Sequence, residues 1–201
     1  MQSTHLLASL IGSRICHDLI SPVGAIQNGL ELLSLEGAVQ GPEMGLISDS
    51  VSAASAKIRF MRIAFGLAGE GQRIGRKEVA AILDDLSQGG RITYDWTPTG
   101  DFRRTAIQEV FLALLCLESA MPQGGVISVT RPDDDPGGWE VSGPGTSARP
   151  DPELWQILAR GAGTEAVMPA HVQFALLPAL VAERHGQIQV IGNDDSLTLR
   201  F

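Results

Sequence analysis

Two stretches of the chain carry apolar residues at alternating steps of three and four. In the first stretch, from Thr4 to about Leu35, the series is Cys16, Leu19, Val23, Ile26, Leu30 and Leu33. In the second, from Glu43 to about Ala68, it is Met44, Ile47, Val51, Ala54, Ile58, Met61, Phe65 and Ala68. This spacing predicts two long helices that pack nearly parallel or antiparallel along a narrow seam.

The joint between the two predicted helices is short. Gly37, Gly41 and Pro42 lie within it and are typical of a helix end followed by a helix start. A joint of this length predicts an antiparallel hairpin. Further apolar residues lie off the seam and need a second partner surface, most simply a second copy in a dimeric four-helix bundle: Leu7, Ile11, Ile15, Ile20, Phe60, Ile63 and Leu67.

The composition changes where four glycines fall between Gly66 and Gly75, which indicates a linker. We therefore divide the chain into residues 1–71 and 72–201. In the second part the patterns predict helices over 76–88, 103–121, 152–160 and 170–185, and strands over 92–97, 126–131, 139–142, 188–191 and 197–201. Turn signals join the strands into two hairpins, so we expect a mixed or antiparallel sheet with helices on one face, in an α+β fold.

Charge and cysteine content exclude several classes of protein. The 201 residues include 15 Lys and Arg against 23 Asp and Glu, and the net charge of −8 argues against a nucleic-acid or anionic-membrane binder. No run approaches the roughly 18 apolar residues of a membrane span. Cys16 and Cys116 lie in apolar helical patterns without metal-ligand spacing, so we expect no metal site, reduced thiols and a cytoplasmic location.

A polar line runs along the first predicted helix, on the face opposite the seam. Its members are all polar or glycine: Arg14, His17, Ser21, Gly24, Asn28 and Glu31. Pro22 in mid-helix costs about 3 kcal/mol, and Gly24 costs about 1 kcal/mol relative to alanine. A helix tolerates such residues more readily where they serve a site, although an exposed histidine by itself is more often simply solvated.

The string His17-Asp18-Leu19-Ile20-Ser21-Pro22 resembles the phosphoacceptor box of dimeric histidine kinases. The resemblance implies that His17 accepts the phosphoryl group, and neutral imidazole is a good nucleophile near pH 7. Asp18 would orient the ring or act as general base. Ser21 matches a position that helps to place hydrolytic water, and Arg14, Ser21, Gly24 and Asn28 would contact the partner.

Residues 108–130 resemble part of the ATP-binding domain of the same kinases, the GHKL or Bergerat fold. In that fold the helix carries two asparagines that hold magnesium and phosphate, and the matching positions are Leu112 and Cys116. Val141 stands where the kinases have the aspartate that recognises adenine, and residues 162–169 lack the glycine-rich lid. We therefore expect a degenerate α/β sandwich that binds neither ATP nor magnesium.

A histidine hairpin followed by a degenerate kinase domain is similar to the ChpT-type histidine phosphotransferases of bacterial phosphorelays. The resemblance spans nearly the whole chain. It implies a homodimer without kinase activity of its own, which takes phosphoryl groups from the receiver domain of a hybrid kinase. It would then pass them to response regulators, whose receiver domains would supply the magnesium.

Two other hypotheses remain open. The chain could be an atypical histidine kinase, in which case it binds nucleotide. It could also be a non-catalytic dimeric scaffold or phosphatase that acts on a receiver, in which case substitution of Ser21 alters receiver dephosphorylation and leaves phosphotransfer unchanged.

Overall fold

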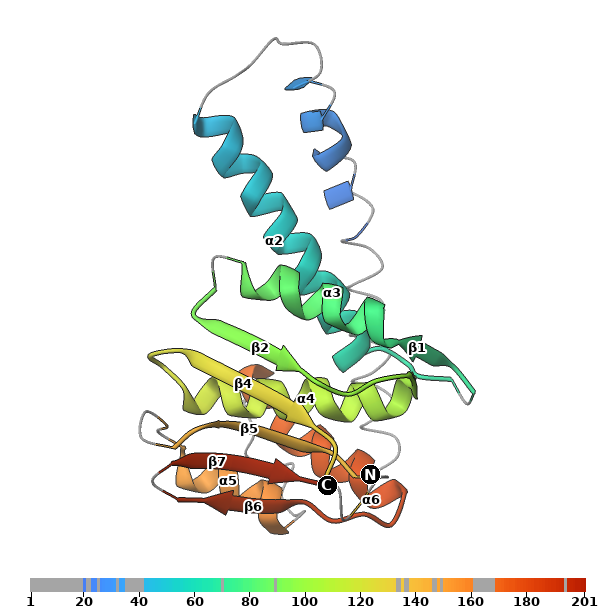
Figure 1. The fold of residues 1–201 in the computed structure, drawn as a ribbon, viewed down its shortest axis with the longest axis vertical. Helices are drawn as coiled ribbons and strands as arrows, with labels where there is room; N and C mark the ends of the chain where they lie inside the picture. The colour runs from blue at the N-terminus through green and yellow to red at the C-terminus, as the bar shows by residue number, and fades with distance from the viewer. Residues whose placement is uncertain are drawn as a thin grey trace.

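The structure is a computed structural model in which a helical hairpin stands on an α+β domain (Figure 1). It describes residues 20, 23–24, 26–31, 33–34, 42–69, 71–88, 90–132, 135, 138–145, 148, 150–160, 169–193 and 195–201. The described residues before position 35 have helical backbone, as predicted for the first stretch. The rest of that stretch lies outside the described residues.

Helix α2 (Pro42–Ala64) forms the other half of the hairpin. It begins at a proline, which suits the first helical position because that residue needs no N–H partner there. We predicted its end near Ala68, and this was wrong by four residues. A Cβ at Gly66 would lie 2.1 Å from the carbonyl oxygen of Arg62, so the chain turns there in a way that only glycine permits.

Apart from β1, β3 and η1, the remaining elements lie close to their predicted positions. The helices are α3 (Arg76–Ser87), α4 (Arg104–Ala120), α5 (Pro152–Arg160), the short 3-10 helix η1 (Pro169–His171) and α6 (Gln173–Glu183). The strands are β1 (Arg73–Gly75), β2 (Ile92–Trp96), β3 (Asp101–Arg103), β4 (Gly125–Thr130), β5 (Glu140–Pro144), β6 (Gln189–Gly192) and β7 (Ser196–Arg200).

Five strands form one mixed sheet in the order β2-β4-β5-β7-β6. Strand β2 pairs with β4 in parallel, and the other three pairings are antiparallel. Helices α4, α5 and α6 lie behind this sheet in the view of Figure 1. The predicted mixed sheet in an α+β fold is confirmed.

Two short strands were not predicted. Strand β1 pairs antiparallel with β3, with Ile74 opposite Phe102. The glycine-rich segment that we read as a linker through Gly75 therefore ends in a strand that is paired within the second part of the chain. Strand β1 has only three residues, which is too few to show the alternation of polar and apolar residues by which a strand is predicted.

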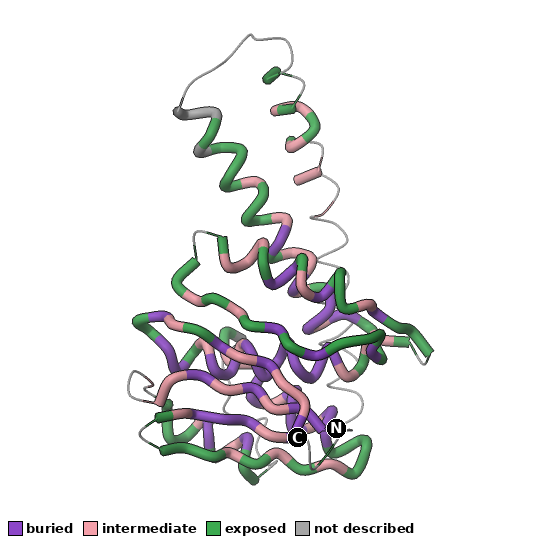
Figure 2. The backbone as a smooth tube through the Cα atoms, in the orientation of Figure 1, coloured by how far each residue is buried: buried purple, intermediate pink, exposed green. Residues whose placement is uncertain are grey.

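The hairpin docks directly onto the second part of the chain. Phe60 and Ile63 are each only 2% exposed, and the ring of Phe60 stacks on Phe111 of α4 at 4.4 Å between centroids. Figure 2 shows the lower end of α2 buried and its upper part exposed. We assigned Phe60 and Ile63 to contact with a second copy, and this was wrong because the chain's own helices cover them.

Candidate functional site

The polar line of the first helix is described only in part. His17, Asp18, Ser21 and Arg14 lie outside the described residues. Gly24 is partly exposed and Asn28 is exposed. A Cβ at Gly24 would meet no atom within 4 Å, so the fold of this chain does not itself require glycine there.

An apolar groove runs between the two helices of the hairpin. It has a volume of about 310 Å³ and is lined by Val23, Ile26, Ile47, Ser50, Val51 and Ala54. The side chains of Ile26 and Ile47 are 52% and 45% exposed. Both were predicted to lie in the seam between the two helices, and instead they leave apolar surface exposed along the hairpin.

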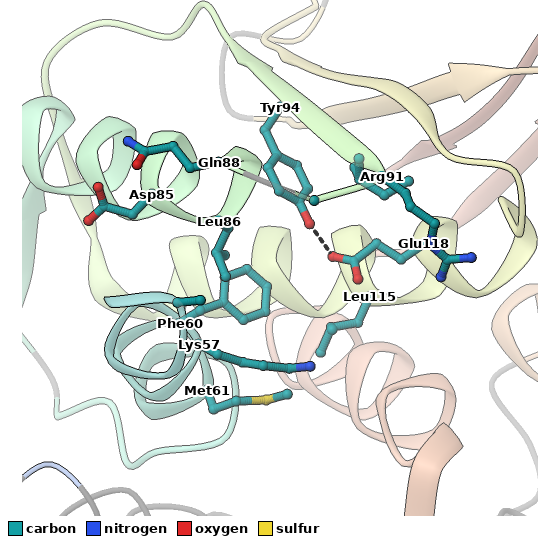
Figure 3. A pocket seen from close by; sticks show the side chains of 13 residues that line it. Lys57, Phe60, Met61, Asp85, Leu86, Gln88, Arg91, Tyr94, Leu115 and Glu118 are labelled. Atoms are coloured by element: carbon teal, nitrogen blue, oxygen red, sulfur yellow. Dashed lines mark hydrogen bonds between the residues drawn. The ribbon is translucent and has the colours of Figure 1, made fainter. Parts of the chain in front are cut away.

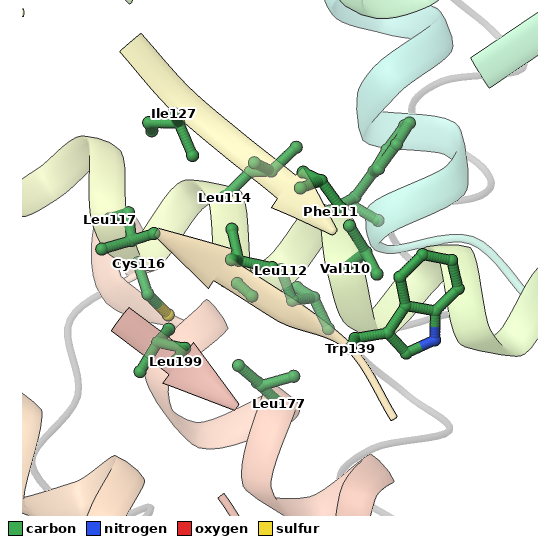
Figure 4. Packing of buried hydrophobic residues seen from close by; sticks show 14 of the residues in the cluster. Val110, Phe111, Leu112, Leu114, Cys116, Leu117, Ile127, Trp139, Leu177 and Leu199 are labelled. Atoms are coloured by element: carbon green, nitrogen blue, oxygen red, sulfur yellow. The ribbon is translucent and has the colours of Figure 1, made fainter. Parts of the chain in front are cut away.

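Three positions match the residues that hold magnesium and adenine in the kinases, and all three lie in the core of the second part of the chain. Leu112, Cys116 and Val141 are all fully buried. In Figure 4, Leu112 and Cys116 lie among apolar side chains, with Leu199 of β7 beside Cys116. Burial raises the pKa of the Cys116 thiol well above its ordinary value, so this group is an uncharged core residue. None of the three side chains can offer oxygen to a hard cation.

A pocket of about 300 Å³ lies where α2 meets the second domain (Figure 3). Lys57 of α2, Arg91 and the paired side chains of Tyr94 and Glu118 line it. The Tyr94 hydroxyl donates a hydrogen bond to Oε1 of Glu118. Burial is the main cause that raises the pKa of Glu118, and the Tyr94 hydrogen bond and the charges of Lys57 and Arg91 oppose it.

A larger cleft, of about 720 Å³, opens at the N-terminal end of α4. Four arginines line it together with two aromatic residues: Arg73, Arg103, Arg131, Arg184, Phe102 and Trp139. The Arg131 guanidinium lies 4.3 Å from the centre of a Trp139 ring. Arg184 Nε donates to the buried Glu109 carboxylate at 3.1 Å. Asp101, Glu109 and Glu183 line the same cleft, so its charges are mixed.

Sequence reasoning missed both of these cavities. Their lining residues come from elements that are far apart in the chain: α2, α3, β2 and α4 contribute to the first cavity, and β1, β3, α4 and α6 to the second. The described residues contain no group of three or more His, Cys, Asp or Glu side chains arranged to hold a metal ion. Among the same residues, no helix has the length and apolar character to cross a membrane.

Comparison with known proteins identifies the family. Residues 76–196 match the family model described as the histidine phosphotransferase C-terminal domain. The chain is 35% identical over 184 residues to protein phosphotransferase ChpT of Brucella abortus (strain 2308), covering 90% of this chain and 87% of that protein. This chain belongs to the histidine phosphotransferase family.

The fold of this histidine phosphotransferase agrees with that assignment. It aligns with a solved bacterial phosphotransferase at a TM-score of 0.64 and 27% identity, covering 94% of this chain and 91% of that one. The sequence-based hypothesis of a phosphorelay histidine phosphotransferase is confirmed at the level of the family. The assignment of roles to individual residues stays a prediction.

Proposed function

We propose that His17 takes a phosphoryl group from the aspartyl phosphate of one receiver domain and passes it to the aspartate of another. The observation that carries the proposal is the string His17-Asp18-Leu19-Ile20-Ser21-Pro22 in a chain of the histidine phosphotransferase family. His17 precedes in the sequence the described part of the hairpin, in which Asn28 is exposed.

The transfer needs only an unprotonated ring nitrogen and a receiver. The imidazole nitrogen of His17 attacks phosphorus, a P–N bond forms, and the P–O bond to the donor aspartate breaks to release its carboxylate. Asp18 orients the ring or takes the ring proton. In the second half the acceptor carboxylate attacks phosphorus, the P–N bond breaks, and His17 returns to the neutral form, taking back any ring proton that Asp18 had accepted.

The phosphoryl donor in this proposal is a phosphorylated protein and not ATP. Leu112, Cys116 and Val141 offer no ligand for magnesium or adenine, and all three are buried among apolar groups. The receiver would supply the magnesium. The protein would act without kinase activity of its own, in the cytoplasm where receiver domains are found.

The same proposal includes a homodimer. Ile26 and Ile47 expose apolar surface along the hairpin, and a second hairpin would cover it to form a four-helix bundle. We keep the division between residues 1–71, which would dimerise and carry His17, and residues 72–201. Arg14, Ser21, Gly24 and Asn28 would line the surface that the receiver touches, where a glycine allows close approach.

A label-transfer experiment tests the role of His17. The purified protein is incubated with a receiver carrying radiolabelled aspartyl phosphate, and label that is stable to base and labile to acid is followed on the chain. We expect base-stable label on the wild type, none on His17→Ala, and full label on the control His171→Ala. Transfer that persists in His17→Ala contradicts the proposal, as does labelling by ATP alone.

Ser21 supports a second candidate, phosphatase action on the receiver, because it occupies the box position that can place water. The substitution Ser21→Ala would then slow hydrolysis of the receiver phosphate by at least about tenfold and leave transfer to His17 unchanged. The atypical-kinase hypothesis has its own test, since it requires heat of binding when magnesium-ATP is titrated into the protein. We expect none.

A further inference from the structure

The C-terminal end of α2 is held by side chains of the second domain. The last carbonyls of a helix have no partner within the helix and need others. Gln108 of α4 meets this need, because its Nε2 donates to the carbonyl oxygens of Ala64 at 3.2 Å and Gly66 at 3.0 Å. Arg104, one turn earlier, donates from Nη2 to the carbonyl oxygen of Arg62 at 2.8 Å.

Apolar packing completes this joint. Phe60 stacks on Phe111 with 9° between the ring planes, and Ala56, Ile63 and Ala64 are at most 2% exposed. On the side facing α3, Arg59 pairs with Asp85 at 2.5 Å. Burial this complete is typical of a domain interior, whereas the default between mobile domains is a smaller and more polar contact.

Gln108 is itself buried, with 4% of its surface exposed. A buried amide that donates to two carbonyls is expensive to replace, because removal of the donor leaves two buried acceptors unsatisfied. A carboxylate of the same shape would place negative charge against both oxygens. The position therefore requires a neutral donor of this length, and the requirement comes from the joint between the two parts of the chain.

The position of this joint along the hairpin can be compared with the position of the groove between its two helices. Val23 and Ile26 share one groove with Val51 and Ala54, so this part of the first helix lies beside the middle of α2. In the antiparallel hairpin that the sequence predicts, the chain before Val23 would run toward the end of α2 that carries Phe60. A receiver that reaches His17 would then meet the second domain as well as the hairpin.

We infer that Gln108 and Arg104 are positioning residues for phosphotransfer: they hold the second domain in one orientation on α2, so that the receiver meets a fixed surface beside His17. The inference rests on the proposed function. It predicts that a loosened joint weakens productive receiver docking and leaves the chemistry at His17 intact.

The test uses the full chain with Gln108→Met, which keeps the size of the side chain and removes both donors. The matched control is Gln156→Met, on an exposed turn of α5. Hydrogen exchange is measured over residues 62–72, and transfer from a phosphorylated receiver is measured across receiver concentrations. We expect exchange over that segment and the receiver KM each to rise about tenfold, with kcat changed by less than about threefold.

Each other result overturns the inference. If exchange rises and the receiver KM does not, the contacts are structural only. If neither changes, Gln108 does not hold the joint. If the wild type takes no phosphate on His17 while exchange still rises in the variant, the proposed function has failed and the joint stands as a structural feature. Should Gln108→Met not fold, Arg104→Met tests the same joint through the bond to Arg62, with the same readouts.

Discussion

At the scale of single residues, Glu118 shows how burial sets the charge of a side chain. Its folded-state pKa is raised from the ordinary value of 4.5, mainly by burial, so the fold binds its proton more tightly than the unfolded chain does. Its contribution to stability is therefore complete below pH 4.5 and is lost as the pH rises through the folded-state pKa. We predict that Glu118→Gln, which can still accept from Tyr94, removes this loss. Urea unfolding of both proteins across pH 4 to 8 measures it.

The matched control for that series is Glu153→Gln, on the exposed first turn of α5. Its unfolding free energy should follow the wild-type pH dependence. If Glu118→Gln also follows the wild type at every pH, then Glu118 is not held in the buried environment described here. The raised pKa of Glu118 could not be predicted from the sequence. Its hydrogen-bond partner Tyr94 lies on β2, and only folding brings β2 and α4 together and buries the pair.

At the scale of elements, α2 depends on the second domain for much of its stability. Phe60 is 2% exposed and stacks on Phe111, so truncation to alanine removes a large buried ring and leaves a cavity. We predict that Phe60→Ala lowers the free energy of unfolding by about 3–5 kcal/mol. The control Val126→Ala, at a position 51% exposed on β4, should change it by less than about 0.5 kcal/mol. Equal losses in the two variants, measured by urea unfolding, would show that α2 does not dock in this way.

Elements with local signals were the ones that sequence could predict. Helix α5 was predicted with its observed bounds, because a proline marks its start and its apolar residues repeat at helical spacing. Strand β4 was placed within one residue, since the Gly124-Gly125 turn before it needs positive φ at both positions. Strands β1 and β3 were missed because each has three residues and pairs with a partner far along the chain.

The same distinction applies to the candidate site. The phosphoacceptor box is a contiguous string, so His17 could be proposed from sequence alone. Phe60 and Ile63 were visible as apolar residues off the seam, but the sequence could not say which surface covers them. The hydrogen bonds from Gln108 to Ala64 and Gly66 join positions more than 40 residues apart, and no local pattern encodes them.

At the scale of the whole molecule, the apolar groove of the hairpin leads to a prediction about assembly. Ile26 and Ile47 are exposed in the single chain, and a second hairpin would bury them in the proposed dimer. A carboxylate placed there would lose its hydration without gaining a partner, which costs several kcal/mol. We predict that Ile47→Glu weakens the dimer by at least about 100-fold. Light scattering on a sizing column should then give 21.3 kDa for the variant and twice that mass for the wild type.

The control for assembly is Thr93→Glu, which adds the same charge at an exposed position of β2, far from the groove. It should keep the mass of the wild type. A wild-type mass of 21.3 kDa at micromolar concentration would contradict the dimer, and so would an Ile47→Glu variant that keeps the doubled mass. Because α2 is also docked on the second domain through Phe60, a monomeric variant should retain the cooperative unfolding of that domain. A variant that is monomeric and still unfolds cooperatively would show that the chain folds without pairing of the two hairpins.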